Sequence, residues 1–435
     1  MDTVIPADGK KPNIFLYIFE VITSIALILN CTTMWSTLRG IRDHYDVVVF
    51  LVALAGLLGC ILASGKLFNL KKFIIALAFT AVVMAFLLIY VYMTWTTSHE
   101  FFRIVIVVSF MIFYFFLCED LAKPPRLLIR LSYVITVIAA IAIICWVLFS
   151  IIKVMPRTSV EYTYWNGQDG DTKVRSFFYI YFTPQGKRNC GIFAEAPIAA
   201  FVYSIGLLIQ LFLKKRSSKV CSIILIIAVA TTRSAFGCAA CAVALIAKLI
   251  IVIVQSERYK QMSKTKRVLI PVLIIVLVLA IIAAFILVFG KKIGGESWTI
   301  RIEDFKGAFS AFLSKPIFGN GYYNTDAIQA FYEGERATGN GFSCSNSLGW
   351  VLSDGGIWFG ILYCVPFLFA IVKSIKHKEP KMFFFTLISF GLFSVIVVPY
   401  QYISILLMLF YGAYRSKIYL NVSIRLKSRK VKDEL

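Results

Sequence analysis

The sequence is short of charge and rich in apolar residues. Only 16% of its 435 residues are charged, against about 25% in ordinary globular domains. Hydrophobic residues make up 59%, and the mean hydropathy is +0.81. A soluble core cannot hide that much apolar surface, so most of the chain is expected to lie in lipid. This excludes a soluble enzyme, a disordered tail and a disulfide-stapled secreted module, and it leaves no room for a large separate catalytic domain.

The residues of common catalytic centres are also scarce. The only histidines are His44, His99 and His377, and none has a second metal ligand at helical spacing. The sequence has no phosphate-binding P-loop and no dinucleotide fingerprint. Asp169-Gly170-Asp171 matches the Asp-x-Asp motif that holds a metal ion and a nucleotide sugar, but it falls in an expected outer loop, away from the nucleotide pool. We expect neither a metal nor a cofactor.

The net charge of +22 does not indicate nucleic acid. The basic residues are scattered in short runs between apolar segments, which is typical of topology signals in membrane proteins. Most of the ten cysteines lie in apolar stretches, where cysteine acts as a small hydrophobe. The first apolar run is long enough to span and lacks a small-residue cleavage site, so no cleavable signal peptide is expected.

The apolar segments predict twelve membrane-spanning helices. A span needs about 20 apolar residues, and 220–254 is too long for one, with Arg233 in its middle. We interpret it as two short helices that meet in a tight turn, where a charge costs less than at the bilayer centre. The expected helices are 13–33, 45–63, 73–93, 102–118, 131–152, 191–213, 220–232, 234–254, 269–290, 347–372, 383–398 and 400–414.

The basic residues predict the orientation of these helices. With the N-terminus inside, 28 of the 45 Lys and Arg residues fall in inner segments and 16 in outer ones, while Lys248 lies within a helix. Twelve of those 16 lie in two long loops, which count little toward topology. Both termini are therefore expected in the cytoplasm. The last four residues, 432–435, spell a retrieval signal that works only in a lumen, so we interpret the match as coincidence.

Polar residues gather in two expected outer loops. In the second loop, Ile302, Phe305, Phe309 and Phe312 recur every three or four residues, which predicts an amphipathic helix in the membrane interface. It should end before Pro316. The predicted organisation is N-terminal helices 1–152, outer loop 153–190, helices 191–290, outer loop 291–346, helices 347–414 and a basic cytoplasmic tail 415–435.

Four short elements between residues 188 and 357 resemble those of the O-antigen ligase and O-antigen or capsule polymerase superfamily, of which the polymerases are the Wzy type. The resemblance covers roughly residues 185–370, in order and with fitting spacing. The elements are Arg188-Asn-Cys-Gly191-Ile192-Phe193-Ala194-Glu195-Ala196-Pro197; Thr232-Arg233-Ser234-Ala235; Arg301-x-x-x-Phe305 with Pro316-Ile-Phe-Gly319-Asn-Gly321; and Ser345-Asn346-Ser347-Leu348 with Asp354-Gly355-Gly356-Ile357.

The resemblance implies an all-α, GT-C-like glycosyltransferase in the bacterial cytoplasmic membrane. Such proteins take a glycan from an undecaprenyl diphosphate donor on the outer face, by a metal-independent, inverting reaction. The acceptor is another lipid-linked glycan in a polymerase and a lipid A core in a ligase. The ligase pattern has His where this chain has Ser345, which favours a polymerase of O-antigen, capsular polysaccharide or exopolysaccharide. A flippase and a chain-length regulator are the implied protein partners.

The resemblance also implies roles for individual residues. Arginines would bind the donor diphosphate, because a guanidinium binds two oxygens at once, and a carboxylate would take the proton of the acceptor hydroxyl. The residues are Arg188, Arg233 and Arg301 for the diphosphate, Glu195 and then Asp354 for the base, Ser345 and Asn346 for orienting the acceptor, and Pro316, Gly319 and Gly321 for shaping the loop.

Each role has a structural alternative. Arg233 would otherwise anchor helix ends to lipid headgroups, and Arg301 would pair with an acid on its own helix. Glu195 would cap a helix or pair with an arginine, and Asp354 would hold a helix-end donor. Glu20, in the first helix, is expected to make a structural hydrogen bond. Aromatic residues in the outer loops suit either sugar stacking or the membrane interface; they are Tyr162, Tyr164, Trp165, Tyr322 and Tyr323.

Three other functions compete with the polymerase. The first is ligase-type transfer to another acceptor. The second is a lipid-oligosaccharide flippase, which would need internally repeated halves and short loops, and neither is visible here. The third is a scaffold of an export complex, a function that would not require the loop motifs.

Overall fold

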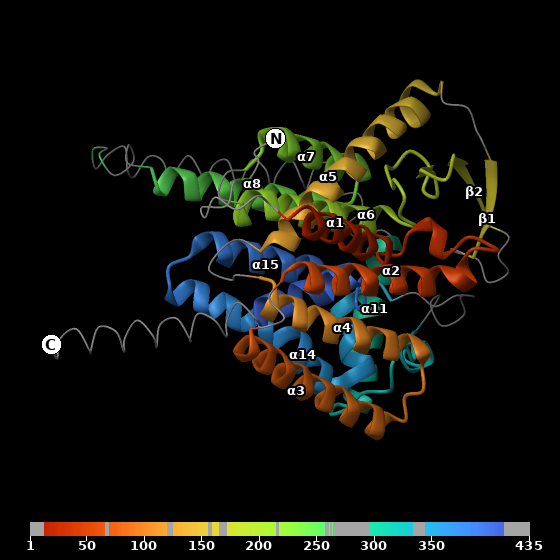
Figure 1. Ribbon diagram of the computed structural model, residues 1–435. Helices are drawn as coiled ribbons and strands as arrows, with labels where there is room; N and C mark the ends of the chain where they lie inside the picture. The colour runs from red at the N-terminus through yellow and green to blue at the C-terminus, as the bar shows by residue number, and fades with distance from the viewer. Residues whose placement is uncertain are drawn as a thin grey trace.

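The fold is mainly helical, with one small sheet (Figure 1). It is described from a computed structural model. The described residues are 13–65, 69–119, 125–154, 159–164, 172–214, 217–256, 261, 263, 296–333 and 344–412.

Seven helical segments of the described residues are long and apolar enough to cross a membrane. They are α2 (Arg42–Ala63), α3 (Leu70–Thr94), α4 (His99–Leu117), α5 (Arg126–Trp146) with the π-helical turn η2 (Val147–Ile152), α6 (Ala196–Leu208) with the π-helical turn η3 (Ile209–Leu213), α8 (Ala235–Val254) and α14 (Ser347–Lys376).

Four shorter apolar helices accompany them. They are α1 (Ile14–Leu29), α7 (Lys219–Thr232), α15 (Pro380–Val395) and Tyr402–Gly412. These segments confirm a polytopic helical membrane protein, and α7 and α8 are the two predicted helices on either side of Arg233. The predicted span 269–290 lies outside the described residues.

Two helices are shorter than predicted at the ends that the sequence places outside. α6 begins at Ala196 rather than at 191, because Glu195 is extended and Pro197 stands in the first turn, where proline has no hydrogen bond to lose. α1 ends at Leu29 rather than at 33, because the chain turns at Thr32, which has a φ of +43°. A short 3₁₀ helix, η1 (Met34–Ser36), follows.

The first outer loop contains a sheet that the sequence did not predict. Strands β1 (Ser159–Thr163), β2 (Thr172–Phe177) and β3 (Tyr181–Phe182) form an antiparallel sheet in the order β1-β2-β3. β1 and β2 lie at one end of the helices in Figure 1. An isolated bridge between Leu38 and Thr163 ties the sheet to the start of α2.

The predicted amphipathic helix is present as α11 (Glu296–Ser314). Its apolar side chains Ile302, Phe305 and Phe309 are exposed, as expected for a helix in the membrane interface. Its opposite face carries the small buried residues Ala308 and Ala311 and packs against α14. A short helix, α12 (Thr325–Gln329), follows, and α14 is kinked at Gly356.

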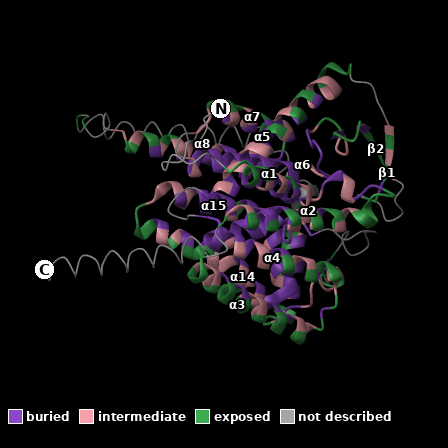
Figure 2. Cartoon of the chain, viewed as in Figure 1, coloured by how far each residue is buried: buried purple, intermediate pink, exposed green. Residues whose placement is uncertain are grey.

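The core lies around α6. Of the seven spanning segments, the α6 segment has the largest share of buried residues, 89%, and α3 has the smallest, 17%. Figure 2 shows the same contrast, with buried residues gathered in the middle of the bundle. Gly206 is needed in this core, because a Cβ there would lie 2.8 Å from the side chain of Ile135 on α5.

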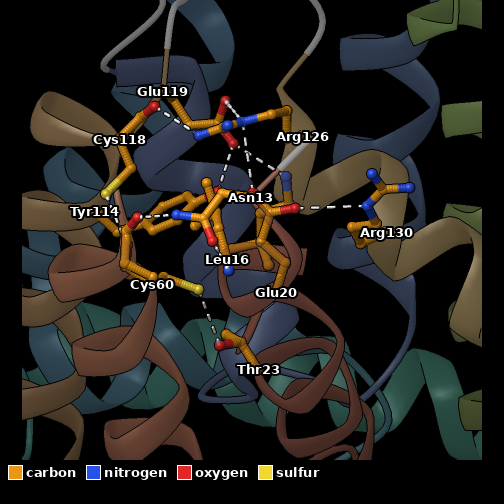
Figure 3. Close-up of polar contacts among 12 residues, drawn as sticks. Asn13, Leu16, Glu20, Thr23, Cys60, Tyr114, Cys118, Glu119, Arg126 and Arg130 are labelled. Atoms are coloured by element: carbon orange, nitrogen blue, oxygen red, sulfur yellow. Dashed lines mark hydrogen bonds and ion pairs between the residues drawn. The ribbon is translucent and has the colours of Figure 1, made fainter. Parts of the chain in front are cut away.

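A polar cluster joins α1, α4 and α5 near their expected cytoplasmic ends (Figure 3). Glu20 is buried, with its carboxylate 3.5 Å from Nε of Arg126 and 3.5 Å from Nε of Arg130. Tyr114 donates its hydroxyl to Glu119 over 2.6 Å, and Glu119 also accepts from the backbone N–H of Leu127 at 3.0 Å. Glu20 was predicted to make a structural hydrogen bond, and it accepts one from Tyr114 at 3.5 Å. Its pairing with two arginines was not predicted.

We expect Glu20→Ala to destabilise the fold. The change leaves two partly buried arginines without their shared partner, which should cost about 1–3 kcal/mol, less than a fully buried pair would, because both arginines reach solvent. Thermal unfolding in detergent measures the loss. The exposed Asp43, changed to Asn, is the control and should unfold like wild type. A Glu20→Ala protein as stable as this control would contradict the structural role.

Candidate functional site

The turn between α7 and α8 presents an arginine to the outside of the bundle. Arg233 is the residue after α7 and has a left-handed backbone with φ +53°. Thr232 stabilises this turn, because its Oγ1 accepts from the N–H of Ser234 at 3.2 Å. Ser234 begins α8 as its N-cap. The side chain of Arg233 is exposed, so the turn holds a cation at the helix ends.

The end of the first outer loop is docked on this turn. Arg188 donates from Nε to the carbonyl oxygen of Thr232 over 2.9 Å. Asn189 donates its N–H to the carbonyl of Thr231 at 3.1 Å and its Nδ2 to the Thr231 hydroxyl at 3.0 Å. These bonds join two of the family-like elements, one before α6 and one between α7 and α8. Asn189 was not predicted as a site residue.

Glu195 stands at the N-cap of α6 but does not cap it. Its side chain accepts no capping hydrogen bond, and the first helical N–H, of Ala196, donates instead to Oε1 of Gln185 at 3.2 Å. Burial raises the pKa of Glu195, while the guanidinium groups of Arg188 and Arg301 lower it. The carboxylate of Glu195 therefore interacts electrostatically with both arginines and does not cap the helix.

Arg301 reaches the same place from the second outer loop. It lies on the first turns of α11, where Nη1 donates to the carbonyl oxygen of Val395 at 3.4 Å. Its guanidinium carbon lies 5.2 Å from the centre of the Phe236 ring, just inside α8. Burial lowers the pKa of Arg301, and the charges of Glu195 and Asp304 raise it.

The cluster has an excess of positive charge. Burial lowers the pKa of Arg188, and the neighbouring Arg233 lowers it further, against the opposite effect of Glu195. Arginine nevertheless remains charged in proteins. By the cationic cluster we mean Arg188, Arg233, Arg301 and Glu195. Arg188 is its shared member, since Glu195 interacts with Arg188 and Arg301, and Arg233 interacts with Arg188. Three guanidiniums and one carboxylate make a setting that suits a polyanionic group.

The start of α14 adjoins this cluster through Asp304. The N–H of Ser345 donates to Oδ2 of Asp304 at 2.9 Å, one helical turn from Arg301. The hydroxyl of Ser345 has no hydrogen-bond partner among the described residues. Asn346 is already engaged, because its Oδ1 accepts from the N–H of Gly349 at 2.6 Å and caps α14. Ser345 is therefore the freer of the two predicted acceptor-orienting residues.

Asp354 is not among the groups that act on the cationic cluster and lies in the first half of α14. It is fully buried, and its Oδ2 accepts from the Tyr400 hydroxyl at 2.6 Å and from the N–H of Tyr323 at 2.7 Å. Its backbone oxygen accepts from the Tyr90 hydroxyl at 3.0 Å and from the N–H of Gly321 at 3.0 Å. These contacts hold the second outer loop against α14.

The predicted loop-forming residues make this contact possible. Gly319 has a φ of +71°, and a Cβ there would lie 2.3 Å from the carbonyl oxygen of Asp354. Pro316 accepts a hydrogen bond through its carbonyl from the N–H of Ile357 at 2.7 Å. Gly321 has a φ of +102° with open space around it. Gly319 thus lets the loop approach the backbone of α14 closely, and Gly321 allows the positive φ of the turn.

The predicted aromatic residues fall in two places. Tyr162 and Tyr164 lie at the β1 edge, where the guanidinium of Arg42 lies 5.2 Å from the centre of the Tyr164 ring. Tyr322 and Tyr323 follow the Gly319–Gly321 turn. Trp165, like Asp169-Gly170-Asp171, lies outside the described residues. Within the described ranges, no group of His, Cys, Asp and Glu is arranged to hold a metal ion.

The comparison with protein families agrees with the resemblance seen in the sequence. Residues 220–364 match the O-antigen ligase family. This O-antigen ligase region contains three of the four elements, those at Arg233, Arg301 and Ser345, whereas the element with Arg188 and Glu195 precedes it. The match supports the resemblance to the O-antigen ligase and polymerase superfamily. Searches of curated proteins and of solved structures found no match.

Proposed function

We propose that this protein is a polymerase that joins undecaprenyl-diphosphate-linked repeat units on the outer face of the cytoplasmic membrane. The observation that carries the proposal is the cationic cluster. The charges of Arg188 and Arg301 act on one carboxylate, Glu195, and Arg233 acts on Arg188 from a third element, the turn between α7 and α8. A lipid diphosphate is the polyanion that the family relationship suggests for such a cluster.

In the reaction, a hydroxyl of the acceptor sugar attacks the anomeric carbon of the donor glycan. The bond from that carbon to the diphosphate oxygen breaks, and the leaving diphosphate keeps the electron pair. Its growing negative charge is stabilised by Arg188, Arg233 and Arg301, which are positioned before the reaction begins. The diphosphate leaves without a proton, so no general acid is needed.

Glu195 is the base that we propose for the acceptor proton. Its carboxylate does not cap α6, and burial raises its pKa toward the working pH. A raised pKa suits a group that must accept a proton. Asp354 is the alternative, but its Oδ2 already accepts two hydrogen bonds. The free hydroxyl of Ser345 can orient the acceptor and cannot take its proton near neutral pH, so the carboxylate is needed.

The proposed orientation has both termini in the cytoplasm. Three helix ends that this orientation places outside lie together, since Gln401 donates to Thr32 at 3.1 Å and Thr33 bridges to Phe193. A periplasm-active reporter fused after Gly186 or Glu333 should be active, and one fused after Lys378 should be silent. A cytosolic signal from the Glu333 fusion would place the cationic cluster on the wrong side for this reaction.

The surface glycans of a deletion strain test the function. A polymerase predicts that long chains disappear while single repeat units remain on the surface. Ligase-type transfer, which the description of the matched family suggests, predicts that long chains stay on their lipid carrier and fail to reach the surface. Units trapped on the inner leaflet would indicate a flippase instead. Either of the last two profiles would contradict the polymerase.

A further inference from the structure

A second polar site lies at the outer ends of α2, α4 and α14, separate from the cationic cluster. Its centre is Tyr323, whose side chain is 52% exposed although its backbone is firmly held. The N–H of Tyr323 donates to the buried carboxylate of Asp354 at 2.7 Å. Its φ of +56° is left-handed, an uncommon conformation for a bulky residue. The fold therefore holds an aromatic ring in one exposed position at the cost of an unfavourable backbone.

Other aromatic rings support this one from below. The ring of Tyr323 lies 5.1 Å from that of Trp350 and 5.9 Å from that of Tyr322. Tyr322 in turn packs 4.7 Å from Tyr400 and 5.2 Å from Phe101. Phe101, Trp350 and Tyr400 are buried, whereas Tyr323 is exposed. The set therefore forms a platform that offers the ring of Tyr323 to a flat apolar surface.

Charged side chains surround the platform. The pKa of Tyr323 is raised to about 12, chiefly by the partial burial of its ring, then by the carboxylates of Glu100, Asp354 and Asp46, with Arg42 acting in the opposite direction. Glu100 and Arg42 belong to the first turns of α4 and α2. Carboxylates accept hydrogen bonds from hydroxyl groups, so the rim of the platform can bind the polar edge of a sugar while the ring stacks on its face.

The position of the platform suits the acceptor rather than the donor. Asp354, which anchors Tyr323, lies seven residues along α14 from Ser347, or about 10 Å at 1.5 Å per residue. Ser347 is joined to the outer end of α15 through the carbonyl of Ile396, next to the Val395 carbonyl that binds Arg301. A sugar on Tyr323 would thus lie about two turns of α14 away from the groups that we assign to the diphosphate. The rim there has charges of both signs, because Arg103 and Arg42 lie near Asp46 and Glu100.

We infer that Tyr323, with Glu100 and Asp46 at its rim, is a binding subsite for a neutral sugar of the acceptor glycan. The inference rests on the proposed transferase function and adds to it the place where the acceptor is held. Asp354 then acts as a positioning residue, which fixes Tyr323 and does not touch the acceptor. The alternative is that Tyr323 only contacts lipid headgroups at the membrane interface, and the experiment distinguishes this role from acceptor binding.

The experiment separates acceptor from donor. The probe is the repeat-unit oligosaccharide on a neutral alkyl chain, which has no diphosphate and so can only accept. Its affinity is measured on the full-length protein in nanodiscs, and its KM at saturating lipid-diphosphate donor. Tyr323→Ala should weaken both about tenfold through lost stacking, with kcat unchanged. Tyr323→Phe keeps the ring and should behave like wild type, and Glu100→Gln should weaken both in the same direction as Tyr323→Ala.

The matched control is Tyr179→Ala. Tyr179 is also an exposed tyrosine with a left-handed backbone, with φ +57°, but it lies in the first outer loop. Its change should leave affinity and KM at wild-type values. Unchanged affinity in Tyr323→Ala, or an equal loss in Tyr179→Ala, would overturn the subsite. A wild-type protein that binds the probe through Tyr323 but forms no polymer would contradict the polymerase and leave the subsite standing.

Discussion

Glu195→Gln should abolish chain extension while leaving the fold and the binding of donor intact. Loss of a general base typically costs about 10²–10⁴-fold in rate, and glutamine keeps the shape of the side chain without its basicity. The measurement is the rate of polymer formation by purified protein with synthetic lipid-diphosphate repeat units. The exposed Glu333 in the same outer region, changed to Gln, is the control and should extend chains at the wild-type rate.

The dependence of this rate on pH gives a second reading of Glu195. The carboxylate must be deprotonated to accept a proton, so activity should rise as the pH increases through its pKa. Because burial raises that pKa, the rise should lie at a higher pH than for an ordinary glutamate, and Glu195→Gln should remove it. Near-normal polymer from Glu195→Gln, with collapse in Asp354→Asn, would transfer the role to Asp354. Activity in both variants would mean that neither carboxylate is the base.

Arg301→Ala should reduce the rate about 100-fold, or about 3 kcal/mol, by removing a charge-assisted contact that strengthens in the transition state. Arg301→Lys should recover little of this, because an ammonium group lacks the two-pronged geometry of guanidinium. The same polymer assay measures both variants. Lys306→Ala, an exposed cation five residues further along α11, is the control and should retain wild-type activity.

A structural role for Arg301 would give a different result. Its Nη1 bonds to the carbonyl of Val395, so a purely structural side chain would lower thermal stability along with activity. If Arg301 binds the diphosphate, Arg301→Ala should unfold near the wild-type temperature while its kcat falls. An Arg301→Ala protein that is expressed normally and still makes full-length polymer at the wild-type rate would show that Arg301 does not bind the diphosphate.

The sequence predicts the helical elements because their signals are local. The segment 220–254 is too long for one span and carries Arg233 in its middle, and the structure has the tight turn there. The spacing of Ile302, Phe305 and Phe309 likewise predicts α11. The strands of the first outer loop are short, at five and six residues for β1 and β2. Asn166-Gly167 and Asp169-Gly170 between them are pairs typical of hairpin turns, but they were not interpreted as such. The sheet was therefore missed.

The contacts within the site could not be predicted from spacing. Arg188 and Glu195 stand more than 100 residues before Arg301 in the sequence, and periodicity carries no information across such a separation. Only the resemblance of the motifs to a family suggested that they belong together. Asp304 is one of the acids on the helix of Arg301, and it also accepts from the N–H of Ser345. That contact depends on how α11 packs on α14.

The most direct measurement of the central claim uses the purified full-length protein, reconstituted in lipid with synthetic undecaprenyl-diphosphate repeat units as both donor and acceptor. The products are separated by length, and the anomeric configuration of the new bond is determined. The account predicts a ladder of chains that differ by one repeat unit, joined with inversion, and a ladder that is lost in Arg301→Ala. Repeat units that remain single, in a protein shown to be folded and to bind the donor, would contradict it.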